Sequence, residues 1–157
     1  MVDSQEINKL FRERGYTLGS AESFTGGLFA KTITAVPGAS HFYKGGLVTY
    51  ATEEKNRLLG VSYAVVDEHG VVSQEVAALM ANNAQKLLNV DYCVSFTGNA
   101  GPEVMEGKPV GQIYIGVAVC DATQVHAYEL EGTREEIQEK AVELAFDLLK
   151  EAILQKN

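Results

Sequence analysis

The sequence has few cysteines, few prolines and few basic residues. Its 157 residues include two cysteines and three prolines, and lysine plus arginine number 13 against 21 for aspartate plus glutamate. The resulting net charge of −8 disfavours nucleic acid and anionic membranes as main partners. Because no Pro-rich linker, low-complexity tract or internal repeat divides the chain, we expect a single domain over residues 1–157.

Long apolar runs are also missing. No segment is long enough to span a bilayer, and the first ten residues carry Asp3 and Glu6 where a signal peptide would be apolar. We therefore expect a cytoplasmic protein with no membrane partner. In that compartment Cys93 and Cys120, both within apolar segments, are expected to be buried reduced thiols.

The spacing of apolar residues predicts helices that alternate with strands before a final hairpin. Helices are expected over 4–14, between Ser23 and Pro37, from Thr52, from Ser73, and from a Thr133–Glu136 capping box. Strands are expected over 16–21, 42–51, 92–96, 113–120 and 125–130, with the hairpin turn at 121–123. This order predicts an α/β fold, a three-layer sandwich in which helices cover both faces of a mixed sheet.

The segment 21–27 places a serine where a strand ends and a helix begins. Gly26 and Gly27 would let backbone N–H groups near Thr25 approach a ligand closely, and the helix dipole would reinforce them. Such donors suit an oxyanion or a phosphate, with Ser23 as a nucleophile. The alternative is structural: Ser23 is an N-cap, and the two glycines allow close helix packing.

A serine nucleophile needs a base, and the three histidines have neither triad nor metal-ligand spacing. Lys55, in the first turn of a helix, is the candidate base, because burial and a helix N-terminus both lower a lysine pKa. The alternative for Lys55 is a solvated surface residue. Tyr50 could relay a proton or be an ordinary core or rim aromatic.

A third segment of interest follows the strand at 92–96. Its small residues could present backbone N–H groups to an anion or simply form a tight turn: Thr97, Gly98, Ala100 and Gly101. Arg134, in the first turn of the last helix, could clamp a phosphate or be an exposed surface arginine.

Together these motifs resemble the C-terminal domain of the competence/damage-inducible CinA family, whose stand-alone members are nicotinamide-nucleotide amidases. The resemblance covers nearly the whole chain. It rests on motifs in the family order at 21–27, 37–40, 45–46 with Tyr50 and Lys55, 57–61, 97–102, 108–111 and Arg134.

The resemblance implies hydrolysis of the carboxamide of nicotinamide mononucleotide, giving nicotinate mononucleotide and ammonia, with no metal or other cofactor. It implies that Ser23 is the nucleophile, Lys55 the base and Tyr50 the hydrogen-bonding partner of the base. The substrate would be lined by Thr25, Gly26, Gly27, Thr97, Gly98, Ala100 and Gly101, with Arg134 nearby. It also points to a homo-oligomer, which is common for enzymes of this size.

Phe24 stands where the family usually has cysteine, and Asn99 where a branched apolar residue is usual, so we expect a pocket of different shape. The competing hypothesis is a non-catalytic nucleotide-binding or interaction module of the same fold, linked to competence or DNA damage. Ser23, Tyr50 and Lys55 together favour an enzyme, because a binding module needs no base. The lack of a P-loop argues against phosphoryl transfer.

Overall fold

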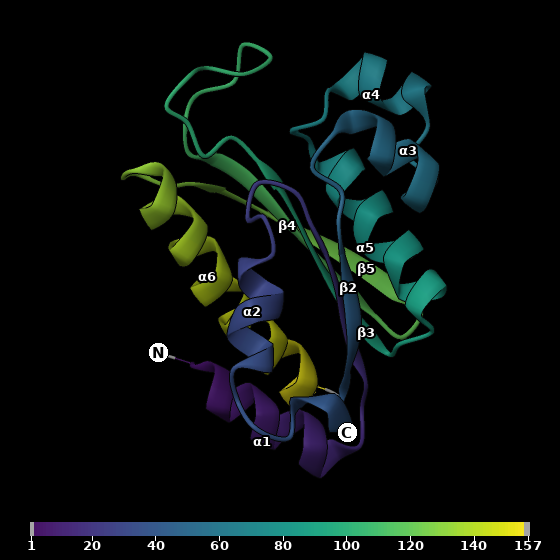
Figure 1. The fold of residues 1–157 in the computed structure, drawn as a ribbon. Coiled ribbons are helices and arrows are strands. Elements are labelled where there is room, and N and C mark those ends of the chain that lie inside the picture. Colours follow the sequence, from purple (N-terminus) through teal and green to yellow (C-terminus); the bar gives the residue numbers. More distant parts are fainter. Residues whose placement is uncertain (1, 156–157) are drawn as a thin grey trace.

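Five strands form one mixed sheet in the computed structural model, which describes residues 2–155 (Figure 1). They are β1 (Leu18–Glu22), β2 (Tyr43–Val48), β3 (Tyr92–Gly98), β4 (Gln112–Val119) and β5 (Ala122–Glu129). The order across the sheet is β2-β1-β3-β4-β5. β1 is parallel to both β2 and β3, whereas β3, β4 and β5 pair antiparallel, so the expected mixed sheet and terminal hairpin are confirmed.

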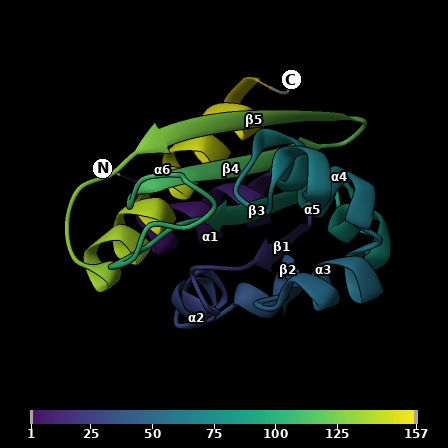
Figure 2. The same ribbon diagram turned by 90° about the horizontal axis from the view of Figure 1, so that it is seen from above.

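Helices cover both faces of this sheet, which confirms the three-layer α/β fold (Figure 2). One face carries α1 (Ser4–Arg14), α2 (Leu28–Thr34) and α6 (Arg134–Gln155). The other carries α3 (Thr52–Leu59), α4 (Tyr63–His69) and α5 (Gln74–Leu88). A short 3₁₀ turn, Ala39–His41, precedes β2. None of the helices within residues 2–155 is both long and apolar enough to cross a membrane.

Local sequence explains where most helices begin and end. In α6 the predicted capping box is present: the Glu136 carboxylate accepts from Thr133 N at 2.9 Å, and the Thr133 hydroxyl accepts from Glu136 N at 3.2 Å. Helix α3 begins at Thr52 as expected, but the N-cap position is Ala51, which has no side chain that could cap the helix. The helix after Ser23 starts later than expected, at Leu28, because a turn intervenes.

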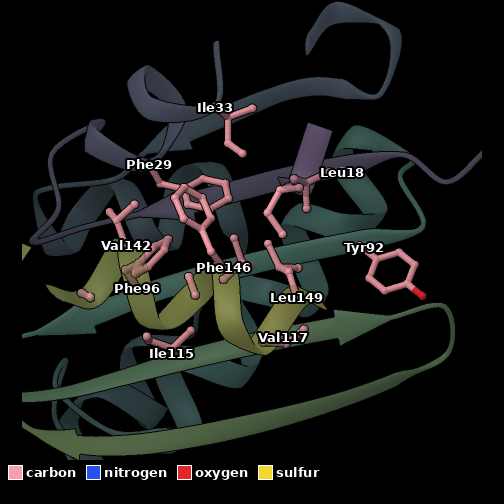
Figure 3. Packing of buried hydrophobic residues seen from close by; sticks show 14 of the residues in the cluster. Leu18, Phe29, Ile33, Tyr92, Phe96, Ile115, Val117, Val142, Phe146 and Leu149 are labelled. Carbon is pink, nitrogen blue, oxygen red and sulfur yellow. The ribbon is translucent and has the colours of Figure 1, made fainter. Parts of the chain in front are cut away.

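The larger core lies between the sheet and the α1–α2–α6 layer, where the Phe29 ring packs at a tilt of 45° against the rings of Phe96 and Phe146 (Figure 3). A smaller apolar core lies under α3 and α5. Cys93 is buried as predicted, but Cys120 is exposed. The prediction for Cys120 is wrong because this residue follows the last position of β4 and enters the hairpin turn with φ +54°, outside the alternation of the strand.

Candidate functional site

The carboxyl ends of β1, β2 and β3 point the same way, because the three strands are parallel. The loops that follow them therefore meet at one edge of the sheet, the usual place for a ligand in such folds. Backbone bonds hold them together beyond the strands: Ser23 N donates to Phe96 O at 3.1 Å, and Thr49 N donates to Glu22 O at 2.9 Å. The three segments singled out in the sequence are thus neighbours.

Ser23 and Lys55 are in direct contact at this edge. Lys55 Nζ donates to Ser23 Oγ at 3.0 Å and to the Thr49 carbonyl at 2.8 Å, with Tyr50 O at 3.5 Å. The exposed fraction is 1% for Lys55 and 8% for Ser23. Lys55 is therefore a buried amine that points at a serine hydroxyl, and the alternative of a solvated surface lysine is wrong.

Burial lowers the pKa of Lys55 from 10.5 to about 8, even though the carboxylates of Glu106 and Glu53 raise it. With a pKa about 8, roughly a tenth of the amines are neutral at pH 7, and about half are neutral one pH unit higher. The neutral amine has a lone pair that can accept the Ser23 proton. The short distance between the two groups and the lowered pKa of the Lys55 amine are what a nucleophile and its base require.

Glu22 is a residue that sequence reasoning missed. Its carboxylate is 1% exposed, and Oε1 accepts from the Thr25 hydroxyl at 2.7 Å, from Gly27 N at 3.2 Å and from Phe29 N at 2.9 Å. Oε2 accepts from Ala30 N at 3.1 Å. The carboxylate thereby caps α2, whose N-cap position is a glycine without a side chain. The available signal was an acidic residue a few positions ahead of a helix start.

The predicted substrate-lining threonines are committed to internal bonds. The Thr25 hydroxyl donates to Glu22, and the Thr97 hydroxyl donates to Val71 O at 2.8 Å, with both side chains buried. In the loop that follows β3, the Gly101 N–H donates to the Asn99 side chain at 2.9 Å, and Ala100 is buried. These residues shape the two loops more than they present polar side chains.

The backbone N–H groups of Phe24 and Thr25 differ in their hydrogen bonding from those of Gly26 and Gly27. Gly26 N donates to Ser23 O at 3.0 Å, and Gly27 N donates to Glu22. The amides of Phe24 and Thr25, by contrast, find no acceptor among residues 2–155. Two unused donors directly after a serine are what an oxyanion requires.

Arg134 joins the rim of the site from α6. Its Nη1 donates to Gly101 O at 2.6 Å, and its Nη2 donates to the hydroxyl of Tyr50 at 2.6 Å. Tyr50 is 60% exposed, so its phenol lies at the rim with Arg134, and only its carbonyl reaches Lys55. Tyr50 is thus a hydrogen-bonding partner of Lys55, as the resemblance implied, but through its backbone carbonyl, while its hydroxyl pairs with Arg134.

The loop 99–111 is held beside the site by its own polar contacts. The Asn99 amide donates to Glu103 O at 2.9 Å, and the Glu106 carboxylate accepts from Val71 N at 2.8 Å and Val72 N at 3.0 Å. Asn99, a departure from the family pattern, therefore stabilises this loop. Two hollows elsewhere, of about 630 and 460 Å³, lie along α1 and beside β5, and neither is lined by Ser23 or Lys55. Over residues 2–155, no group of three or more His, Cys, Asp or Glu side chains is placed to hold a metal ion.

Comparisons with known proteins agree with this architecture. The sequence model of the CinA C-terminal domain matches residues 3–153. A competence-damage inducible protein from Caldanaerobacter subterraneus subsp. tengcongensis is 44% identical over 154 residues, 95% of this chain and 37% of the relative. A CinA-like protein from Geotalea uraniireducens is 44% identical over 149 residues, 94% of this chain and 36% of that protein. The chain thus spans roughly a third of these curated relatives.

Solved structures match over almost their full length. Competence damage-inducible protein A from Klebsiella pneumoniae superposes with a TM-score of 0.94 at 28% identity, covering 99% of both chains. A competence/damage inducible protein from Agrobacterium tumefaciens superposes with a TM-score of 0.91 at 30% identity, covering 95% of this chain and 92% of that one.

Replacing Glu22 tests its role in holding the turn after Ser23. Glu22→Ala removes the acceptor of one hydroxyl and three amide donors, so we expect the free energy of unfolding to fall by about 2–4 kcal/mol. Glu22→Gln keeps one carbonyl oxygen and should lose less. Urea denaturation measures both, with the exposed Glu68→Ala as the control. A loss for Glu22→Ala no larger than for the control would show that the carboxylate is dispensable.

Proposed function

The chain belongs to the CinA C-terminal domain family, and we propose that it is an amidohydrolase acting on nicotinamide mononucleotide. The products are nicotinate mononucleotide and ammonia. The observation that carries the proposal is the 3.0 Å hydrogen bond between the buried amine of Lys55 and the hydroxyl of Ser23. A nucleotide-binding module without catalysis has no use for a buried amine of lowered pKa at a serine, so this pair favours the enzyme over that alternative.

In the first half of the reaction, neutral Lys55 takes the proton of Ser23 as Oγ attacks the carboxamide carbon. The carbonyl π electrons move to oxygen, and the unused N–H groups of Phe24 and Thr25 supply donors for the oxyanion. The Lys55 ammonium then gives its proton to the departing nitrogen as the C–N bond breaks. Ammonia leaves, and nicotinate remains as an ester of Ser23.

In the second half, water replaces ammonia beside the ester. Lys55, neutral again, takes a proton from water as its oxygen attacks the ester carbon. Collapse of the tetrahedral intermediate breaks the bond to Ser23 Oγ, which recovers its proton from Lys55. The acid product is released, and both residues return to their starting states.

Three N–H groups of the Arg134 guanidinium remain beyond its bonds to Gly101 and Tyr50. They lie at the rim, where the far end of a nucleotide would reach while its carboxamide lies at Ser23. In a chain of net charge −8, a local donor of this kind is needed to hold a phosphate. This charge supports a nucleotide, rather than free nicotinamide, as the substrate.

Ser23→Ala is the direct test of the reaction. The variant should fold like the wild type and release ammonia from nicotinamide mononucleotide several orders of magnitude more slowly, because the nucleophile is gone. Ammonia release and melting temperature are measured on the same preparation. A folded Ser23→Ala protein with wild-type turnover would rule out the serine mechanism, and a wild type without turnover would favour the binding module.

The pH profile tests Lys55 as the base. Because Lys55 must be neutral and burial lowers its pKa to about 8, kcat/KM should rise about tenfold per pH unit below that value and level off above it. Lys55→Arg should be nearly inactive at every pH, because arginine keeps its proton. If Lys55→Arg retained activity, the charge of residue 55, and not its proton transfer, would be what matters.

Removing the phosphate tests the nucleotide end of the substrate. We expect the nucleoside, nicotinamide riboside, to show a kcat/KM lower by about a hundredfold, because two charge-assisted bonds are lost. Arg134→Gln should lower kcat/KM for the nucleotide and change it little for the nucleoside. Equal losses for both substrates would mean that Arg134 only supports the Gly101 loop.

A further inference from the structure

We infer that Gln138 is a positioning residue for this reaction: it orients the Phe24–Thr25 peptide so that the Thr25 N–H faces the nucleophile as an oxyanion donor. The inference rests on the proposed function and adds to it a residue outside the motifs that identify the family resemblance. Gln138 touches neither Ser23 nor Lys55, and it acts through one backbone carbonyl.

The contact is a single long-range hydrogen bond. Gln138 Nε2 donates to Phe24 O at 2.8 Å, and the two residues are 114 positions apart in the chain. Phe24 directly follows the nucleophile, and Gln138 lies in the second turn of α6, which runs beside α2 (Figure 1). Gln138 is half-buried, so water competes only partly for this carbonyl.

Because the peptide bond is planar, this contact fixes the orientation of the whole Phe24–Thr25 peptide group. In a trans peptide the C=O of one residue and the N–H of the next point in opposite directions. The Phe24 C=O points to α6, which covers one face of the sheet, whereas Lys55 comes from α3 on the opposite face (Figure 2). The Thr25 N–H is therefore directed away from α6 and toward the face on which Lys55 meets Ser23.

The other contacts of this turn agree with that role. Thr25 N–H has no acceptor within residues 2–155, although the hydroxyl of the same residue is held by Glu22. Without a donor at position 138, the Phe24 carbonyl would lose its partner, and the peptide could rotate its oxygen toward the developing oxyanion. Like partial charges would then meet in the transition state, so the rate of the chemical step should fall while ground-state binding changes little.

The contacts of Arg134, on the same helix, distinguish a residue that binds substrate from Gln138, which positions the backbone. Arg134 lies four residues before Gln138, on the same side of α6, and holds Gly101 and Tyr50. One helix side thus reaches both the nucleophile turn and the Gly101 loop. Arg134 retains free donors for a phosphate, whereas Gln138 is engaged with the backbone beside Ser23, so their variants should affect different kinetic constants.

The experiment compares three variants with nicotinamide mononucleotide as substrate. Gln138→Met is close in shape and has no donor; kcat should fall about ten- to a hundredfold with KM within about twofold. Gln138→Arg restores a donor and should recover most of kcat. Glu139→Met, at the exposed neighbouring position, should match the wild type. A folded Gln138→Met with wild-type kcat, or with a raised KM and unchanged kcat, would overturn the inference.

A second readout does not depend on the amide substrate. Phenylmethylsulfonyl fluoride reacts when Lys55 takes the Ser23 proton, Oγ attacks sulfur, and the S–F bond breaks to release fluoride. Negative charge then develops on a sulfonyl oxygen, which needs the same donors. The rate of the mass increase at Ser23 should fall in Gln138→Met and recover in Gln138→Arg. If the wild type reacts with this reagent but does not hydrolyse the nucleotide, the substrate proposal fails, and slower reaction of Gln138→Met still supports the inference. Equal rates of mass increase at Ser23 in the wild type and in Gln138→Met would refute the inference about Gln138. A wild type that does not react with the reagent would also refute it.

Discussion

The rest of the site depends on one constraint, the burial of the Lys55 amine against the Ser23 hydroxyl. A buried amine needs acceptors, and the chain supplies the Ser23 hydroxyl and the carbonyl of Thr49. Both acceptors stand where they do because β1 and β2 are parallel neighbours, so that the residues just beyond them lie side by side. The same desolvation that makes this arrangement demanding lowers the pKa of the amine into the range where a base is useful.

Adjacent residues at the end of β1 keep opposite charges apart. Side chains alternate across a strand, so Glu22 points to α2 while Ser23 points to α3 and its lysine. The Glu22 carboxylate is satisfied by four donors of the turn and α2 on its own face of the sheet. If it faced Lys55 instead, an ion pair would raise the lysine pKa and keep the amine protonated. Strand geometry thus lets one carboxylate organise the nucleophile turn without neutralising the base.

The sequence predicted the parts of the fold and site that depend on local pattern. Apolar periodicity and the Thr133–Glu136 capping box predicted the mixed sheet and the last helix, and position after a strand brought Ser23 and Lys55 into consideration. It did not predict α4, a helix of seven residues with no buried side chain and hence no periodic apolar signal. Nor could it predict that the Tyr50 phenol would reach Arg134, or that Gln138 would reach Phe24, because those contacts join segments far apart in the chain.

The lowered pKa of Lys55 also has a consequence for stability. The folded-state pKa, about 8, lies below the ordinary value of 10.5, so the unfolded chain binds more protons between these values, and this residue makes stability rise with pH there. Below about pH 8 the buried lysine lowers the free energy of unfolding by its full amount, on the order of 3 kcal/mol by the usual conversion of a pKa difference into free energy. A residue that served only the fold would not carry such a penalty, since an apolar side chain of similar length would fill the same space. The apolar core around Phe29 and the bonds of Glu22 offset it, which is why a destabilised base can persist at the edge of an otherwise well-packed sheet.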